Sequence, residues 1–201
     1  MVLNRIRTKI EVYISMLAKP IAKTEVSPTF FTVSGIVLSF IGFILLASVQ
    51  YNPQSASNFM LVAIVVFLVS FIFDGIDGAI ARISGKVSSL GAFLDSLSDR
   101  ICESFLLLGL IVAGFANSIL CASFLATSLI ISYCRARGES LGVKMSGVGL
   151  MERAERAILI LMGMVLWFIN NESLNFVLAL GLLLNSVTIV QRTWKIVSSL
   201  R

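Results

Sequence analysis

The stretch Phe73–Arg100, FDGIDGAIARISGKVSSLGAFLDSLSDR, decides how this chain folds and where its chemistry lies. It holds two carboxylate pairs at helical spacing, Asp74 with Asp77 and Asp95 with Asp99. On a helix the two members of each pair share a face. Long apolar runs flank the stretch, and acids in a membrane are costly unless they face a cavity, a cation or one another. Carboxylate oxygens suit Mg²⁺, Mn²⁺ or Ca²⁺, so the stretch predicts a divalent-metal site between two helices.

The composition is typical of proteins that cross a membrane several times. Of the 201 residues, 57% are hydrophobic and only 13% are charged, and the mean hydropathy is +0.96. The net charge is +5, but the basic residues flank apolar segments, which argues against nucleic acid as a partner. The three cysteines lie in or beside apolar runs and are interpreted as packing residues. Histidine is absent, so a general base has to be a carboxylate, Lys, Tyr or Cys.

The pattern of apolar and charged positions in the first 24 residues predicts an amphipathic helix that lies in the membrane interface. Their apolar residues recur at steps of three and four: Leu3, Ile6, Ile10, Ile14, Leu17 and Ile21. Charged residues occupy other positions, so the segment is too polar to span a bilayer. A surface helix of a soluble protein is the alternative, which the following membrane segment disfavours. We therefore divide the chain into an interfacial helix, 1–24, and a membrane domain, 25–201.

The rest of the chain consists of apolar segments separated by turns. No charged residue occurs from Val26 to Phe73, a run too long for one crossing of about 20 residues, and the turn residues 51–55 (YNPQS) divide it. Ser27 and Pro28 mark the start of the first helix. The expected fold is an all-α membrane protein with six transmembrane helices, over residues 28–50, 56–83, 88–113, 119–139, 151–169 and 174–196.

Loop charges predict how these helices are oriented. Lys and Arg gather before the first helix, at the turn between the second and third, around the loop between the fourth and fifth, and at the end of the chain. The three turns at the opposite ends contain neither residue. The positive-inside rule then predicts a multi-pass protein of the cell membrane, with both termini and the carboxylate site on the cytoplasmic side.

The carboxylates belong to a longer pattern, Asp74-x2-Asp77-Gly78-x2-Ala81-Arg82-x8-Gly91-x3-Asp95-x3-Asp99. It matches every fixed position of the signature of the CDP-alcohol phosphatidyltransferases, and the chain resembles that family over nearly its whole length. The family displaces CMP from a CDP-linked lipid by an alcohol, in phospholipid biosynthesis. The resemblance implies a CDP-linked lipid and membrane lipids as partners, and it suggests a homodimer.

The resemblance also implies roles for the four acids. Asp74, Asp77 and Asp95 would be metal ligands, and Asp99 would deprotonate the acceptor hydroxyl and also touch a metal. Two Mg²⁺ or Mn²⁺ ions about 4 Å apart would clamp a phosphoryl group and stabilise the leaving phosphate.

Four further residues of the pattern are candidates for binding the CDP-linked lipid. Gly78, Ala81 and Gly91 are small, so two helices can approach and a pyrophosphate can reach the metals. Arg82 lies close to the same helical face as Asp74 and could bind a phosphate through its planar guanidinium.

Two interpretations outside this family stay open. The acids could form a buried ion-pair network with Arg82 and Arg100. Glu103, one turn beyond Asp99, could support the site or such a network. Intramembrane acids with a basic rim could also belong to a divalent-cation transporter, whose acids would lie near the bilayer midplane. Here they cluster near the predicted cytoplasmic helix ends, which disfavours a transporter.

Arginines gather where the fourth and fifth predicted helices face each other, in residues 132–139 (SYCRARGE) and 149–156 (GLMERAER). Such a cluster suits an acceptor that is itself a phosphate, although topology and contact with anionic lipids could also explain it. Both segments resemble those of family members that use inositol 1-phosphate, the phosphatidylinositol-phosphate synthases and their archaeal counterparts with an archaeol lipid. The candidate acceptor-binding residues are Arg135, Arg137, Arg153, Arg156 and Arg192.

The acceptor alcohol is therefore predicted by resemblance to be inositol 1-phosphate. Glycerol 3-phosphate would also suit an anion pocket and would make the chain a phosphatidylglycerophosphate synthase. Free serine does not require so many arginines and is disfavoured. The transferred group could be phosphatidyl, with ester-linked chains, or archaetidyl, with ether-linked chains.

Overall fold

The computed structural model describes residue 16 and residues 18–22 and 26–201. Residue 16 and residues 18–22 are helical, and the remainder of the predicted interfacial helix lies outside the described residues. The long helices are α2 (Pro28–Ala47), α3 (Ala56–Ile83), α4 (Ser89–Ala113), α5 (Ser118–Ser140), α6 (Arg153–Leu166) and α7 (Ser173–Leu200). Two short 3₁₀ turns, η1 (Ser48–Gln50) and η2 (Pro53–Ser55), join α2 to α3.

Local sequence sets the helix ends. Pro28 occupies the first turn of α2, where its missing N–H costs no hydrogen bond. Ser88 caps α4 by accepting a hydrogen bond from Gly91 N at 3.0 Å, and Asn117 caps α5 through its side-chain oxygen. Gly114 ends α4 with a φ of 70°, a conformation that favours glycine. The helices therefore begin and end close to their predicted bounds, with the exception of α6.

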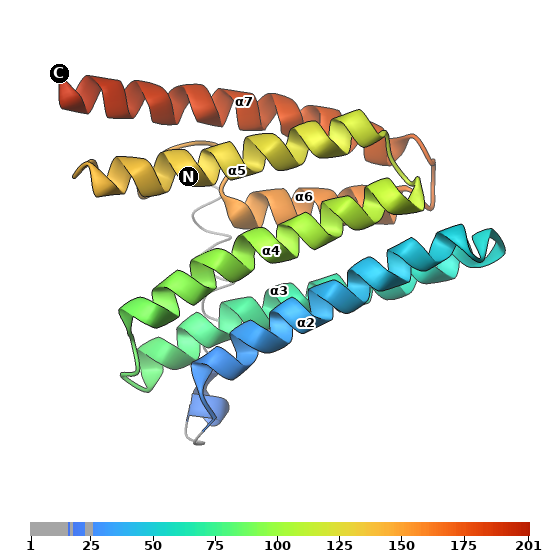
Figure 1. Ribbon diagram of the computed structural model, residues 1–201, viewed down its shortest axis with the longest axis horizontal. Helices are drawn as coiled ribbons and strands as arrows, with labels where there is room; N and C mark the ends of the chain where they lie inside the picture. Colours follow the sequence, from blue (N-terminus) through green and yellow to red (C-terminus); the bar gives the residue numbers. More distant parts are fainter. Residues whose placement is uncertain (1–15, 17, 23–25) are drawn as a thin grey trace.

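The helices alternate in direction and lie side by side (Figure 1). Helix α2 packs against α3 and α4, while α7 packs against α5 and α6; α4 also contacts α5, and α3 contacts α6. The α2–α3, α4–α5 and α6–α7 connections lie at one end of the molecule, and the α3–α4 and α5–α6 connections lie at the other, with the C-terminus. Within residues 26–201, the connections at the first end hold neither Lys nor Arg, while those at the second end hold Lys86 and Lys144.

The core is apolar and joins all of these helices. Its fully buried members include Phe67 of α3, Leu106 of α4, Phe124 of α5 and Met164 of α6. Many large apolar side chains also face outward, among them Phe30, Val37, Leu61, Leu129 and Leu183. An apolar outer surface of this extent suits a protein that is surrounded by lipid.

Four segments of the described chain are long and apolar enough to cross a membrane: Pro28–Gln50, Pro53–Ile83, Ser118–Ser140 and Ser173–Leu200. Helix α4 differs because it carries charged residues at Asp95, Asp99, Arg100 and Glu103. Helix α6 has 14 residues, or about 21 Å of helix, against a bilayer core about 30 Å thick. The predicted all-α fold is confirmed for the described chain, with four helices that could cross a membrane, while the six predicted spans would also require α4 and α6.

Helix α6 is shorter than the predicted range of 151–169. Gly142, Gly147 and Gly149 take positive φ values, which fit a loop better than a helix. The loop extends to residue 152, because Met151 N donates to Thr188 Oγ1 of α7 and Glu152 is extended, so α6 begins at Arg153. This places the Arg153 side chain in the first turn of the helix, beside the site described next.

Candidate active site

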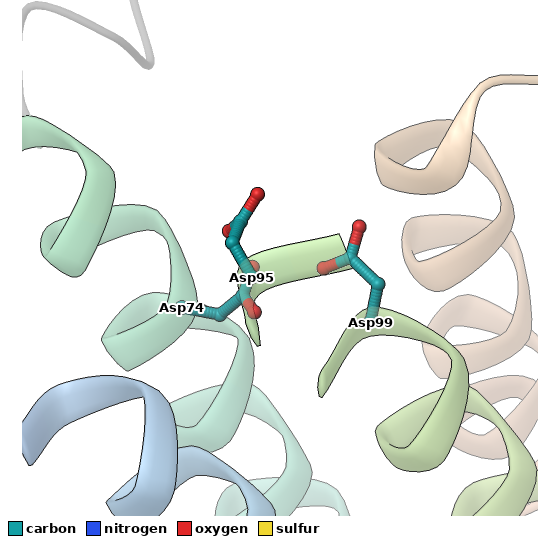
Figure 2. Close-up of side chains that lie close together, drawn as sticks. All are labelled: Asp74, Asp95 and Asp99. Atoms are coloured by element: carbon teal, nitrogen blue, oxygen red, sulfur yellow. The ribbon is translucent and has the colours of Figure 1, made fainter. Parts of the chain in front are cut away.

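Helices α3 and α4 bring three of the four predicted acids together. Oxygen atoms of Asp74, Asp95 and Asp99, here called the carboxylate cluster, all lie within 4.8 Å of one another. Figure 2 shows these three side chains close together, Asp74 from α3 and the other two from α4. Ser98 of α4 donates a hydrogen bond to Asp74 Oδ1 at 3.0 Å, which fixes this carboxylate across the helix pair. Asp74 is only 8% exposed, so its charge requires a nearby cation or hydrogen-bond donors.

Asp77, the fourth acid, is not part of this group of three. It is 3% exposed, and its Oδ2 accepts a hydrogen bond from Thr32 Oγ1 of α2 at 2.5 Å. Its Oδ1 is buried and has no hydrogen-bond partner among the described residues. Asp77 therefore joins α2 to the site and keeps one oxygen available for a ligand.

Arginine side chains supply positive charge beside the carboxylate cluster. Arg153 Nη1 of α6 pairs with the carboxylates of both Asp74 and Asp99. The Arg153 guanidinium also lies 5.8 Å from the centre of the Phe71 ring. Arg100 Nη1 lies 3.2 Å from Asp99 Oδ2. The cluster thus faces one guanidinium group from α4 and one from α6.

The donor set fits a hard divalent cation. Three carboxylates offer oxygen atoms from two helices, close enough to share an ion. Asp77 Oδ1 is a buried acceptor that lacks a hydrogen-bond partner within the described chain, and a cation would satisfy it. The residues present therefore suit Mg²⁺ or Mn²⁺, as the sequence pattern predicts.

A cavity of about 490 Å³ lies beside the cluster, between α4, α5, α6 and Arg192 of α7. Asp95 and Asp99 line it. The basic residues in its lining are Arg100, Arg135, Arg153, Arg156 and Arg192. The predicted metal site and most of the predicted arginine cluster therefore open onto one space.

The five candidate acceptor-binding arginines have different surroundings. Arg135 lines the cavity and keeps 44% of its side chain exposed, with Nε 3.1 Å from Glu139 Oε1. Arg153 keeps 25% of its side chain exposed. Arg137 instead donates to Ser140 Oγ among exposed residues at the end of α5. Arg135 and Arg153 are the two best placed to meet an anion in the cavity.

Arg156 and Arg192 are buried and connect the helices that line the cavity. Arg156 is 3% exposed, and its Nε and Nη2 donate to the two carboxylate oxygens of Glu103 at 2.7 and 3.0 Å. Glu103, for which the sequence left two roles open, thus forms a buried ion pair between α4 and α6. Arg192 is 2% exposed and donates to the backbone oxygens of Val148 and Ile131, so it joins α7 to α5 and to the loop before α6.

The candidate CDP-lipid residues lie near the end of the molecule where α3 turns into α4. A Cβ atom added at Gly78 would lie 3.4 Å from Arg82 Nη1, so the exposed Arg82 side chain lies along the same face of α3. Gly91 occupies the first turn of α4, where a Cβ atom would lie 3.1 Å from the capping Ser88 Oγ. Ala81 is half-buried on α3 between these positions.

Two site residues were missed by sequence reasoning. Ser98 lies between Asp95 and Asp99, three residues after the first, so its place on the same helix face was a usable signal. Thr32 is one of four hydroxyl residues in α2, with Thr29, Ser34 and Ser39, and nothing local connects it with Asp77, 45 residues away.

The fold and the site together define a helical membrane protein with an acidic centre that fits a divalent cation. Beside this centre lies a cavity whose arginines could bind phosphate groups. The sequence profile of the family described as CDP-alcohol phosphatidyltransferase matches residues 25–190, and the chain belongs to this family. It is accordingly a transferase of phospholipid biosynthesis, and the resemblance expected from the sequence is confirmed.

Within this family, the chain is similar to proteins that are named as inositol phosphate synthases. The archaetidylinositol phosphate synthase of Aeropyrum pernix is 38% identical over 139 residues, which cover 69% of this chain and 71% of that protein. The archaetidylinositol phosphate synthase of Pyrococcus horikoshii is 29% identical over 193 residues, covering 96% and 95%. The crystal structure of Mycobacterium tuberculosis phosphatidylinositol phosphate synthase with CDP-DAG bound matches with a TM-score of 0.75 and 27% identity, covering 91% of this chain and 92% of that one. Its complex with manganese and citrate matches with the same TM-score.

Replacing Glu103 tests whether the buried ion pair holds α4 to α6. Glu103→Gln leaves the Arg156 guanidinium buried without its counter-charge, and breaking such a pair costs about 3–5 kcal/mol. We expect a markedly lower thermal unfolding midpoint in detergent. The matched control is Glu139→Gln, which makes the same change in the exposed pair with Arg135 and should cost about 0–1 kcal/mol. Small, equal shifts for the two variants would contradict this role of the pair.

Proposed function

We propose that this enzyme transfers the phosphatidyl or archaetidyl group of a CDP-linked lipid to inositol 1-phosphate and releases CMP. The observation that carries the proposal is the shared cavity, onto which both Asp95 and Asp99 of the carboxylate cluster and the side chains of Arg135 and Arg153 open. A reaction between a lipid pyrophosphate and a phosphorylated alcohol requires two anion sites around one reacting centre. Both named relatives and the matched M. tuberculosis enzyme are inositol phosphate synthases of this kind by name, which supports the same acceptor.

The four acids are assigned to binding metal. Asp74, Asp95 and Asp99 would hold Mg²⁺ or Mn²⁺ within the carboxylate cluster, and Asp77 would add its unpartnered oxygen. Two bound ions would neutralise the pyrophosphate and stabilise the charge that develops on the departing CMP. Gly78, Ala81 and Gly91 would leave room for the pyrophosphate, and Arg82 would bind one of its phosphates.

Asp99 is assigned as the general base. Its side chain lines the cavity and keeps 18% exposure, so an acceptor hydroxyl can reach it. The hydroxyl passes its proton to the Asp99 carboxylate, and its oxygen attacks the phosphorus that bears the lipid. The bond between this phosphorus and the bridging oxygen of CMP breaks, and CMP leaves with the electron pair.

The arginines are assigned to orienting the acceptor. Arg135 and Arg153 would bind its phosphate, while Arg156 and Arg192 would keep the walls in place through their buried contacts. Inositol 1-phosphate fits because a rigid ring separates its phosphate from its reacting hydroxyl, so binding at the arginines fixes the direction of attack. Arg137, on the exposed end of α5, would serve only to attract anions toward the site. Glycerol 3-phosphate is the second candidate, since the same arginines would bind its phosphate.

We also assign six membrane spans, with α4 and α6 crossing beside the four apolar segments. The support is that α4 and α6 lie alongside the other helices, and that the connections alternate between two ends (Figure 1). The end rich in Lys and Arg would face the cytoplasm, with both termini and the active site. The N-terminal interfacial helix, location in the cell membrane and a homodimer stay predictions of the sequence analysis.

The acceptor assignment is tested by an assay of CMP release from purified enzyme. Inositol 1-phosphate should give the highest rate in a panel with glycerol 3-phosphate, serine and free inositol, and mass spectrometry should find the inositol phosphate lipid. EDTA should abolish CMP release, and Mg²⁺ or Mn²⁺ should restore it. A higher rate with glycerol 3-phosphate would favour the second candidate. A higher rate with serine or free inositol would contradict the assignment of the arginines to an acceptor phosphate. Full activity without metal would contradict the assignment of the acids to a metal site.

The base assignment is tested by Asp99→Asn. The variant should bind the CDP-linked lipid but lose turnover by about 10²–10⁴-fold, because the acceptor hydroxyl keeps its proton. Asp74→Asn is the matched comparison. It should lower the affinity for Mn²⁺ measured by calorimetry, whereas Asp99→Asn should keep Mn²⁺ binding. Turnover at the wild-type rate in Asp99→Asn would assign the base to another group.

The orientation of the protein in the membrane is tested by cysteine labelling in a variant that lacks Cys102, Cys121 and Cys134. A cysteine at Gln54, in the α2–α3 connection, should react with an impermeant thiol reagent added outside cells. One at Ser84, in the α3–α4 connection, should react only after the membrane is permeabilised. The reverse pattern would place the active site on the outer face.

A further inference from the structure

Arg153 occupies the point where the two halves of the site meet. It lies in the first turn of α6, and its Nη1 contacts Asp74 on α3 and Asp99 on α4. Its Nη2 is buried and has no hydrogen-bond partner in the described part of the chain. The same side chain lines the cavity with Arg135. One guanidinium group can therefore serve either the carboxylate cluster or a ligand in the cavity.

The fold directs Arg153 toward the carboxylates. One turn further along both helices, Arg156 of α6 holds Glu103 of α4 in a buried pair with two hydrogen bonds. This pair fixes the register between the helices, because Asp99 precedes Glu103 by four residues and Arg153 precedes Arg156 by three. The Phe71 ring lies beside the Arg153 guanidinium and limits its movement on the α3 side.

A divalent cation and the Arg153 guanidinium compete for the same carboxylates. Asp74 and Asp99, which pair with Arg153, are two of the three residues whose oxygens lie within 4.8 Å of one another. Two positive groups at these oxygens would repel each other, and burial strengthens this repulsion. Full coordination of a metal by the cluster therefore requires that Arg153 release at least part of its contacts.

We propose that Arg153 is an internal counter-cation, which metal binding displaces from the carboxylate cluster and makes available to the acceptor phosphate. Without metal, Arg153 neutralises Asp74 and Asp99, and its charge is unavailable to the cavity. With metal bound, the carboxylates no longer need it, and the guanidinium can turn its donors toward an anion beside Arg135. Bound metal then raises the affinity of the cavity for the acceptor phosphate by some factor. By linkage, bound acceptor phosphate raises the affinity of the cluster for metal by that same factor. This inference rests on the proposed function only in taking the acceptor to be a phosphate.

The direct test is the affinity of the metal-free protein for Mn²⁺, measured by the electron paramagnetic resonance signal of free Mn²⁺ without any substrate. Arg153→Gln removes the competitor, so Mn²⁺ should bind about tenfold more tightly than to the wild type. Arg135→Gln is the matched control, because it removes the same charge from the cavity but from a residue that pairs with Glu139. Arg153→Lys keeps a cation and should stay closer to the wild type. Equal or weaker Mn²⁺ binding by Arg153→Gln, or equal tightening by Arg135→Gln, would overturn the proposal.

A second measurement uses the wild-type protein and so does not depend on the folding of a variant. Phenylglyoxal modifies accessible arginines, and mass spectrometry reports the extent at each site. Mn²⁺ should increase modification of Arg153 relative to Arg135, because metal binding frees the Arg153 guanidinium. An unchanged or lower ratio would contradict displacement. Neither measurement contains an acceptor, so they can fail while inositol 1-phosphate remains the preferred acceptor, and they can succeed if glycerol 3-phosphate is preferred.

Discussion

Mutual repulsion among closely spaced carboxylates is the constraint on which the rest of this structure depends. Helices α3 and α4 bring Asp74, Asp95 and Asp99 together, with Asp74 buried and the other two facing the cavity. A hydrogen bond from Ser98 and the guanidinium group of Arg153 offset this repulsion. A divalent cation at these oxygens would offset it too, in place of Arg153.

The same constraint explains why the helices meet where they do. Helices α3 and α4 supply the four acids, and α2 supplies the hydroxyl of Thr32. Helices α5, α6 and α7 supply the cavity arginines other than Arg100, which belongs to α4. Ion pairs between α6 and the α3–α4 pair join these two groups at the active site. The cavity between them is lined by carboxylates and by arginines. Such a space can hold a metal-bound pyrophosphate and a second phosphate together, which a transfer between two phosphorylated substrates requires.

Much of this arrangement is encoded locally. The bounds of α3, Ala56–Ile83, agree with the sequence prediction because turn residues precede it and a glycine turn follows it. The cluster of Asp74, Asp95 and Asp99 was also predicted, since helical spacing places each acid on a defined face. The class of enzyme followed from the pattern of which these acids are part, and the family match confirms it.

The remainder depends on how distant segments pack. The contact between Arg153 and Asp74 joins residues 79 positions apart, and that between Arg156 and Glu103 joins residues 53 apart. No local periodicity predicts which acid an arginine contacts. The sequence therefore predicted one acceptor-binding group of five arginines, although in the structure their contacts differ. Helices α4 and α6 are not among the four segments that are long and apolar enough to cross a membrane, because α4 carries charged residues and α6 is short. Charges placed for function reduce the hydropathy signal by which a membrane span is recognised.

The central claim is that one cavity brings a metal-bound pyrophosphate and an acceptor phosphate together. A crystal structure with Mn²⁺ and inositol 1-phosphorothioate tests it most directly, because anomalous scattering locates manganese and sulfur independently. The account predicts manganese among Asp74, Asp95 and Asp99, and sulfur beside Arg135 and Arg153 in the same cavity. Manganese away from these carboxylates, or sulfur outside the cavity, would contradict it.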